Sequence, residues 1–138
     1  MTEKEFALLQ GLYFEQAVMS LLERAGCDVC YTGGNGDFGV DIVCIYDNIR
    51  IAIQCKYRNC GVVGNQAVQA VVGGMRLYSC DRALVVTNQC FSRMAQIQAA
   101  ANDVVLIDGQ SLLDIVPNDT GNIELFDRLF GLVYKIED

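Results

Sequence analysis

Apolar residues along the chain recur with two periods, and together these predict a succession of helices and strands. Spacings of three and four residues indicate amphipathic helices, whereas short alternating or continuous apolar runs indicate strands. We expect helices at residues 2–25, 65–79, 92–102, 111–116 and 123–134. We expect strands at residues 27–31, 39–46, 49–56, 82–87 and 104–107. Three successive strands followed by strand–helix alternation predict an α/β fold with a mixed sheet flanked by helices.

A two-residue turn at residues 47–48 joins the second and third expected strands. Such a short loop sets the register of a hairpin, and counting outward places Asp41 directly opposite Gln54. Opposed side chains have Cβ atoms about 4.5–5.5 Å apart. Lys56 follows Gln54 by two residues and therefore projects from the same face. The hairpin is predicted to gather a carboxylate, an amide oxygen and an ammonium group, as metal-assisted phosphodiester chemistry requires. The structural alternative is a cross-strand hydrogen bond beside a solvated lysine.

Glu15 is a second candidate, because it lies in an apolar stripe of the first expected helix. A buried carboxylate is costly unless it is paired or bound to a metal ion. The alternative is a glutamate at the edge of the stripe that reaches solvent or pairs with an arginine.

The composition fits one domain spanning residues 1–138, with 52% hydrophobic residues and no apolar run near the roughly 20 residues of a membrane span. The N-terminal sequence does not resemble a signal peptide, so we expect a cytoplasmic protein. Seven cysteines and no histidine are present. Cys27 and Cys30 have the spacing of a metal or redox motif, but a zinc site would need scattered partners such as Cys55 and Cys60. Buried, reduced thiols are the expected state, and a structural or redox-sensing protein is the alternative.

The net charge of −7 argues against strong non-specific binding to nucleic acid. Part of the excess comes from residues 114–138, which hold six acidic and two basic residues. A small basic strip is expected from five residues: Arg50, Lys56, Arg58, Arg76 and Arg93.

The glycine-rich segment at residues 32–39, TGGNGDFG, matches the pattern GxGxxG. A dinucleotide site requires a helix after the glycines, whereas a strand is expected here, so nucleotide binding is not predicted. The segment is predicted to be a substrate-facing loop. Asp37 is predicted to be an exposed turn residue, with contact to a metal ion or water as the alternative.

Taken together, these motifs resemble the Mrr-type restriction endonuclease catalytic domain of the PD-(D/E)xK nuclease superfamily. No single motif is specific, but their order and spacing are. The matching residues are 11–15, 33–41, 54–56, 83–88, 91–92 with 95, and 106–109 with 112.

The resemblance implies a restriction endonuclease-like αβββαβ core and a metal-dependent, restriction-type DNA endonuclease. Asp41 matches the metal-binding aspartate of the family, Gln54 its second ligand position, Lys56 its catalytic lysine and Glu15 the acid of the first helix. Gln54 departs from the glutamate common in the superfamily, but glutamine is typical of the Mrr-like branch. The backbone carbonyl of Cys55 is a further candidate ligand for Mg²⁺ or Mn²⁺.

DNA is therefore the expected partner, although Mrr-type proteins usually carry an additional DNA-binding domain that does not fit in this chain. We also expect a homodimer, because the helix at residues 123–134 is more apolar than a small core needs and because cutting both strands requires two sites or re-binding. Residues 67–74 are a second candidate dimer surface. The alternatives are a non-cleaving module that binds DNA or a partner, and a Holliday junction resolvase-like nuclease.

Overall fold

The computed structural model describes residues 2–32 and 39–115. Its helices are α1 (Glu3–Arg24), α2 (Asn65–Leu77), α3 (Arg93–Ala101) and α4 (Gly109–Ile115). Its strands are β1 (Asp28–Tyr31), β2 (Ile42–Tyr46), β3 (Ile49–Lys56), β4 (Val62–Val63), β5 (Arg82–Thr87), β6 (Cys90–Phe91) and β7 (Val104–Ile107). The expected helix at residues 123–134 and Asp37 lie outside the described residues.

A five-stranded sheet with the order β1-β2-β3-β5-β7 forms the centre of the fold. The first three strands pair antiparallel, whereas β5 and β7 continue the sheet in parallel. The predicted α/β fold with a mixed sheet is thus confirmed. The short strands β4 and β6 pair in parallel as a separate sheet. They were not predicted, because two residues are too few to show a period.

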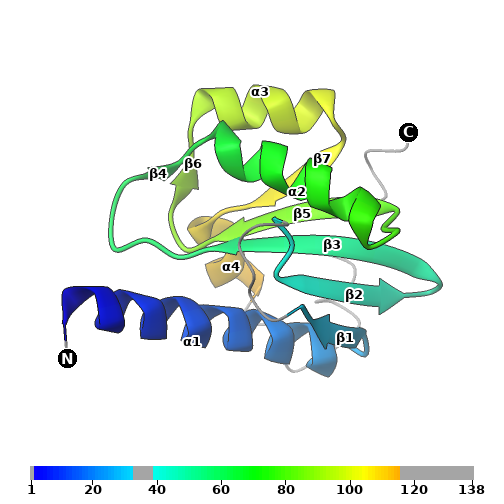
Figure 1. Cartoon of the computed structure of the whole chain (residues 1–138), viewed down its shortest axis with the longest axis horizontal. Helices are drawn as coiled ribbons and strands as arrows, with labels where there is room; N and C mark the ends of the chain where they lie inside the picture. Colours follow the sequence, from blue (N-terminus) through cyan, green and yellow to red (C-terminus); the bar gives the residue numbers. More distant parts are fainter. Residues whose placement is uncertain (1, 33–38, 116–138) are drawn as a thin grey trace.

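The helices cover the two faces of the sheet, with α1 and α4 on one face and α2 and α3 on the other (Figure 1). Side chains of β3 alternate between the two hydrophobic cores. Ile51, Ile53 and Cys55 pack in the core that includes α1, whereas Ala52 packs in the core that includes α2. This alternation is the period of two that is typical of a strand buried on both faces.

Local signals in the sequence set several element ends as predicted. The Thr2 hydroxyl accepts from the Glu5 amide and the Glu5 carboxylate accepts from the Thr2 amide, which completes a capping box. The Ser92 hydroxyl caps α3 by accepting from the Ala95 amide. The hairpin turn has φ of 51° at Asp47 and 66° at Asn48, as a type I′ turn requires.

The cysteines do not all follow the prediction of burial. Three of them are buried, namely Cys27, Cys44 and Cys55, whereas Cys30, Cys60 and Cys90 are exposed.

Within the described residues, no helix is both long enough and apolar enough to cross a membrane.

Gly39 holds the chain close to α2 just before the predicted metal-binding residue. Its φ is +68°, a conformation that side chains disfavour, and an added Cβ would lie 2.2 Å from the Ala70 carbonyl oxygen. A glycine is therefore required at this position both by backbone conformation and by space.

We predict that Gly39→Ala lowers the free energy of unfolding by about 1–3 kcal/mol, because the backbone of α2 must move. Gly73→Ala is the matched control: it lies within α2 with nothing near its added Cβ, so we expect a gain of up to about 1 kcal/mol. Urea unfolding of both variants measures this difference. Equal effects of the two substitutions would contradict the required close approach.

Candidate active site

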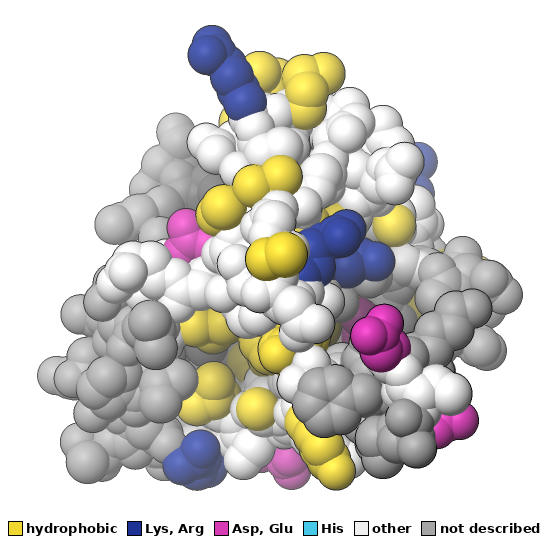
Figure 2. Space-filling view, turned by 90° about the vertical axis from the view of Figure 1, so that its left-hand side faces the viewer, with side chains coloured by type: hydrophobic (Ala, Val, Ile, Leu, Met, Phe, Trp, Pro, Cys, Tyr) yellow, Lys and Arg dark blue, Asp and Glu magenta, His cyan; other side chains and the backbone are white. Residues whose placement is uncertain are grey.

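The candidate residues gather where β2 begins and where the parallel strands β3 and β5 end. Lys56 and Thr87 are the paired last residues of β3 and β5. This end of the molecule is on the left of Figure 1 and faces the viewer in Figure 2. There, basic and acidic side chains lie next to each other beside a recess with hydrophobic side chains (Figure 2). Ligand sites in open α/β sheets commonly lie at the carboxyl ends of parallel strands.

The backbone of Asp41 departs from the counted register. The paired part of β2 begins at Ile42, which faces Ile53. The Asp41 amide also donates to the Ile53 carbonyl at 2.8 Å. Two residues of one strand thus meet a single residue of the other, as in a β-bulge. The expectation that Asp41 continues the strand directly opposite Gln54 is therefore corrected, because counting from a turn cannot reveal a bulge.

The Asp41 carboxylate turns towards the backbone of β3. Its Oδ2 accepts a hydrogen bond from the Cys55 amide at 2.8 Å, and the side chain is buried. Burial raises the pKa of this carboxyl above its ordinary value, while the Cys55 amide and the positive charge of Lys56 act in the opposite direction. The Asp41 carboxylate is therefore held in place in an environment that disfavours its charge.

Glu15 projects from α1 towards the same place. Its Oε1 accepts a hydrogen bond from the Tyr31 hydroxyl at 3.0 Å. Partial burial and the charge of Asp41 raise the pKa of the Glu15 carboxyl, and the Tyr31 hydrogen bond lowers it. The partner of Glu15 is thus a tyrosine rather than the arginine considered in the sequence alternative.

Gln54 and Lys56 follow Ala52 at steps of two residues, so they belong to the face of β3 that packs in the core with α2. Gln54 is buried, and its Oε1 has no hydrogen-bond partner among the described residues. Lys56 is partly exposed and interacts electrostatically with Asp41. Asp41 therefore interacts with both groups, with Glu15 from α1 and with Lys56 from β3. That Gln54 completes this set remains a prediction.

Two sets of contacts hold the surrounding segments. The Arg58 amide donates to Asn88 Oδ1 at 2.9 Å, and Asn88 Nδ2 donates to the Arg58 carbonyl at 2.7 Å. The rings of Phe14 and Tyr57 pack with centroids 6.0 Å apart. The segment after β3 is thereby tied both to the end of β5 and to the residue preceding Glu15.

The donor set fits a hard divalent cation. Asp41 and Glu15 supply two carboxylates whose mutual repulsion a cation would relieve, and Gln54 supplies a buried oxygen without a partner. The described residues contain no cluster of three or more His, Cys, Asp or Glu side chains able to hold a metal ion. The candidate set contains two carboxylates, Asp41 and Glu15, and is therefore smaller than such a cluster.

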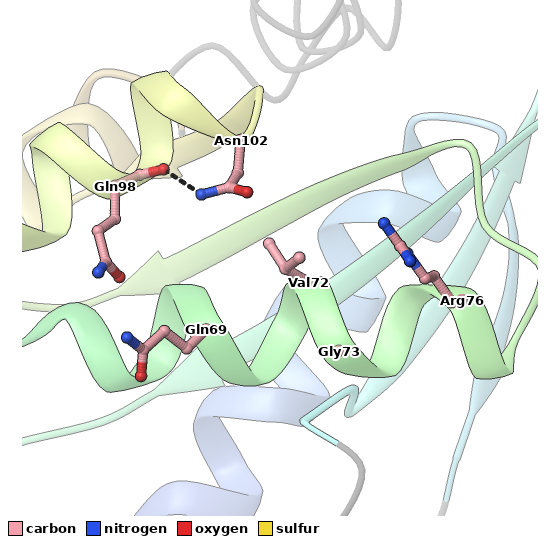
Figure 3. A pocket seen from close by; sticks show the side chains of 6 residues that line it. All are labelled: Gln69, Val72, Gly73, Arg76, Gln98 and Asn102. Carbon is pink, nitrogen blue, oxygen red and sulfur yellow. Dashed lines mark hydrogen bonds between the residues drawn. The ribbon is translucent and has the colours of Figure 1, made fainter.

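A groove of about 470 Å³ lies elsewhere, between α2 and α3. Figure 3 shows its lining residues: Gln69, Val72, Gly73, Arg76, Gln98 and Asn102. None of these residues is a carboxylate, so the groove lacks the anionic ligands that a divalent cation prefers.

The expected basic strip does not form one continuous surface. Arg50 and Lys56 lie near opposite ends of β3. The Arg50 guanidinium donates to the Tyr78 carbonyl at 2.8 Å, at the hairpin end of the sheet. Arg76 lines the groove beside α3. Among the five basic residues, Lys56 is the residue that interacts with the candidate site.

A family model described as a restriction endonuclease, the Mrr catalytic domain, matches residues 6–116. The match includes Glu15, Asp41, Gln54 and Lys56 and covers most of the chain. The chain belongs to the Mrr-type restriction endonuclease family. The resemblance inferred from the sequence motifs is thus confirmed.

Solved structures share the fold of this Mrr-type chain. The DNA modification-dependent restriction endonuclease AspBHI aligns with a TM-score of 0.60 and 15% identity over 99% of this chain and 40% of its own. The restriction endonuclease MspJI, in complex with a 27-mer oligonucleotide, aligns with a TM-score of 0.53 and 22% identity over 96% and 32%. The protein of unknown function AF1548 aligns with a TM-score of 0.59 and 23% identity over 70% and 58%.

The Mrr-type chain therefore spans less than two thirds of each of these three proteins. At these identities the likeness shows the restriction endonuclease-like fold. No curated protein matches the chain in sequence.

Two residues of the site were missed from the sequence, Tyr31 and Thr32. The Thr32 amide donates to the Asp41 carbonyl at 3.0 Å. The Thr32 hydroxyl lies 2.5 Å from the Val40 carbonyl and 3.0 Å from the Asp41 carbonyl. Tyr31 is the last residue of the short strand β1 and Thr32 follows it, and the apolar pattern of the strand alone does not distinguish them. The alternation of side chains along β1 offered one signal for Tyr31. Tyr31 lies two residues after Val29 and so shares its face, and Val29 packs against the core that includes α1.

We predict that Asp41→Asn raises the free energy of unfolding at neutral pH by about 1 kcal/mol, a typical gain on relieving a destabilised functional group. The folded state binds the Asp41 proton more tightly than the unfolded state does. This contribution to stability is present below the ordinary pKa of 3.8 and is lost as the pH rises through the raised value.

The advantage of Asp41→Asn should therefore be largest near pH 7 and vanish towards pH 4. Urea unfolding at both pH values, without divalent metal, measures it. Glu23→Gln removes the same charge from an exposed residue of α1 and is the matched control. Its free energy of unfolding should differ little from that of the wild type at either pH. An Asn variant less stable than the wild type at pH 7 would contradict the cost assigned to the Asp41 charge.

Proposed function

We propose that the chain is a divalent-metal-dependent endodeoxyribonuclease that hydrolyses phosphodiester bonds. The observation that carries this proposal is the pair of interacting carboxylates of Asp41 and Glu15, with Lys56 beside Asp41. Burial disfavours the charges of both acids, and the charge of Asp41 further disfavours that of Glu15, as expected for a site that binds a cation. Membership of the restriction endonuclease family supports the same reaction.

Each residue has a role that follows from its chemistry. Asp41 and Glu15 would hold Mg²⁺ or Mn²⁺ through carboxylate oxygens, with neutral oxygens from Gln54 and the Cys55 carbonyl. The bound metal supplies Lewis acidity and relief of negative charge at the phosphate. The Lys56 ammonium donates a hydrogen bond that orients the attacking water or stabilises charge on the pentavalent phosphorus. Because Asp41 and Gln54 supply one negative charge between them, Glu15 provides the second.

DNA is the proposed substrate, and the charge distribution is compatible with it. Four of the seven net negative charges come from residues 114–138, where six acidic residues oppose two basic ones. Of the remainder, Asp41 and Glu15 would be offset by the cation. A homodimer is part of the proposal, since cleavage of both strands needs two sites. The small residues Ala67 and Gly74 of the second candidate dimer surface are buried within the chain, so residues 123–134 remain the preferred surface.

We predict that the wild type nicks supercoiled plasmid with Mg²⁺ or Mn²⁺ and that a chelator abolishes nicking. Asp41→Ala and Lys56→Ala should each lower the rate by at least about 100-fold, because each removes charge stabilisation at the phosphate. The exposed Glu23→Ala in α1 is the control and should cleave at the wild-type rate. Circular dichroism checks that each variant is folded. Wild-type nicking by either site variant would refute the assigned roles, and plasmid binding without nicking would favour a non-cleaving module.

We predict that Gln54→Glu binds Mg²⁺ more tightly, because hard cations prefer anionic oxygen. Activity should be unchanged or lower, since the new carboxylate can pair with the Lys56 ammonium and draw it from the water or phosphate. Calorimetric metal titration beside the nicking assay measures both effects. Unchanged metal affinity would mean that Gln54 does not bind the metal directly.

A further inference from the structure

The end of β1 contacts both acidic residues of the candidate site through two consecutive residues. The Tyr31 hydroxyl donates to Glu15 Oε1 at 3.0 Å. The next residue, Thr32, donates to the Asp41 carbonyl from its amide, and its hydroxyl contacts the Val40 and Asp41 carbonyls. One carboxylate side chain and the backbone of the other acid are thus attached to the same dipeptide.

These contacts connect α1 and the start of β2 through the end of β1. Tyr31 is the last residue of β1 and pairs with Ile42, the first residue of β2. Glu15 is on a separate element, α1, and is only partly buried, so a free glutamate side chain there would have several rotamers. The Tyr31 hydrogen bond favours the rotamers that keep the Glu15 carboxylate at this hydroxyl. There, the charge of Asp41 is near enough to raise the pKa of Glu15.

We propose that Tyr31 is a positioning residue that holds the Glu15 carboxylate ready for a divalent cation, with Thr32 fixing the backbone of Asp41 beside it. This inference rests on the proposed function only in taking Glu15 as a metal ligand. Tyr31 acts through Glu15 and has no chemical step of its own. Hydrogen bonds that orient metal ligands commonly affect metal affinity by about 10–100-fold when removed.

The test is a double-mutant cycle with Tyr31→Phe and Glu15→Gln, read as Mn²⁺ affinity by calorimetry without DNA. Tyr31→Phe removes only the hydroxyl, so the ring remains in place. We expect about tenfold weaker Mn²⁺ binding for Tyr31→Phe in the wild-type background. In the Glu15→Gln background, Tyr31→Phe should have no further effect, since the group that it positions is no longer a carboxylate.

Tyr13→Phe is the matched control, because Tyr13 is an exposed tyrosine of α1 and its substitution should leave Mn²⁺ affinity unchanged. Urea unfolding of all variants separates positioning from a loss of stability. Wild-type Mn²⁺ affinity in Tyr31→Phe would overturn the inference. So would losses that multiply in the double variant, because they would show that Tyr31 acts independently of Glu15.

The inference and the proposed function fail in different ways. A wild type that binds Mn²⁺ but never cleaves DNA refutes the proposed function, while a weakened Tyr31→Phe still supports the positioning role. A wild type that cleaves DNA, with Tyr31→Phe binding Mn²⁺ equally well, refutes the positioning role alone. A wild type that neither binds Mn²⁺ nor cleaves DNA refutes both.

Discussion

The hydrogen bond from the Cys55 amide to the Asp41 carboxylate, 2.8 Å long, is the contact on which the candidate site depends. It replaces part of the regular ladder between β2 and β3 at the point where the bulge turns Asp41 out of register. The same strand, β3, ends in Lys56. One backbone segment therefore both donates a hydrogen bond to the Asp41 carboxylate and carries the Lys56 ammonium group that interacts with it. Burial of a charged carboxylate costs free energy unless hydrogen-bond donors or positive charges replace the lost water.

Several further contacts hold the segments around this hydrogen bond. Gly39 itself lies close to Ala70 of α2, and Thr32 contacts the Asp41 carbonyl. The two cores pack against opposite faces of β3, so that its residues from Ile51 to Cys55 are all buried. The Phe14–Tyr57 ring contact ties α1, and with it Glu15, to the end of β3. Precision at the site thus comes from rigid elements that meet at one edge, as functional sites require.

The site also illustrates a conflict between stability and function. Two acids repel each other, and burial disfavours the charge of both. A buried amide oxygen of Gln54 has no partner among the described residues. Each feature costs stability in the folded chain, and under the proposed function a bound hard cation would relieve the repulsion between the two acids. Buried groups that lack partners and so lower stability are typical of functional sites in folds whose other buried polar groups are hydrogen-bonded.

The sequence by itself determined the mixed α/β fold, the hairpin register near its turn and the family. These follow from periodicity, from a two-residue turn that permits one register, and from motif order, all of which are local in the chain. The tertiary structure decided the bulge at Asp41, the pairing of Glu15 with Tyr31 and the dispersal of the basic residues. These depend on contacts between residues 12 or more positions apart in the chain, the shortest being Asp41 to Ile53. No local pattern encodes such contacts, because they arise only when packing of the two cores brings the elements together.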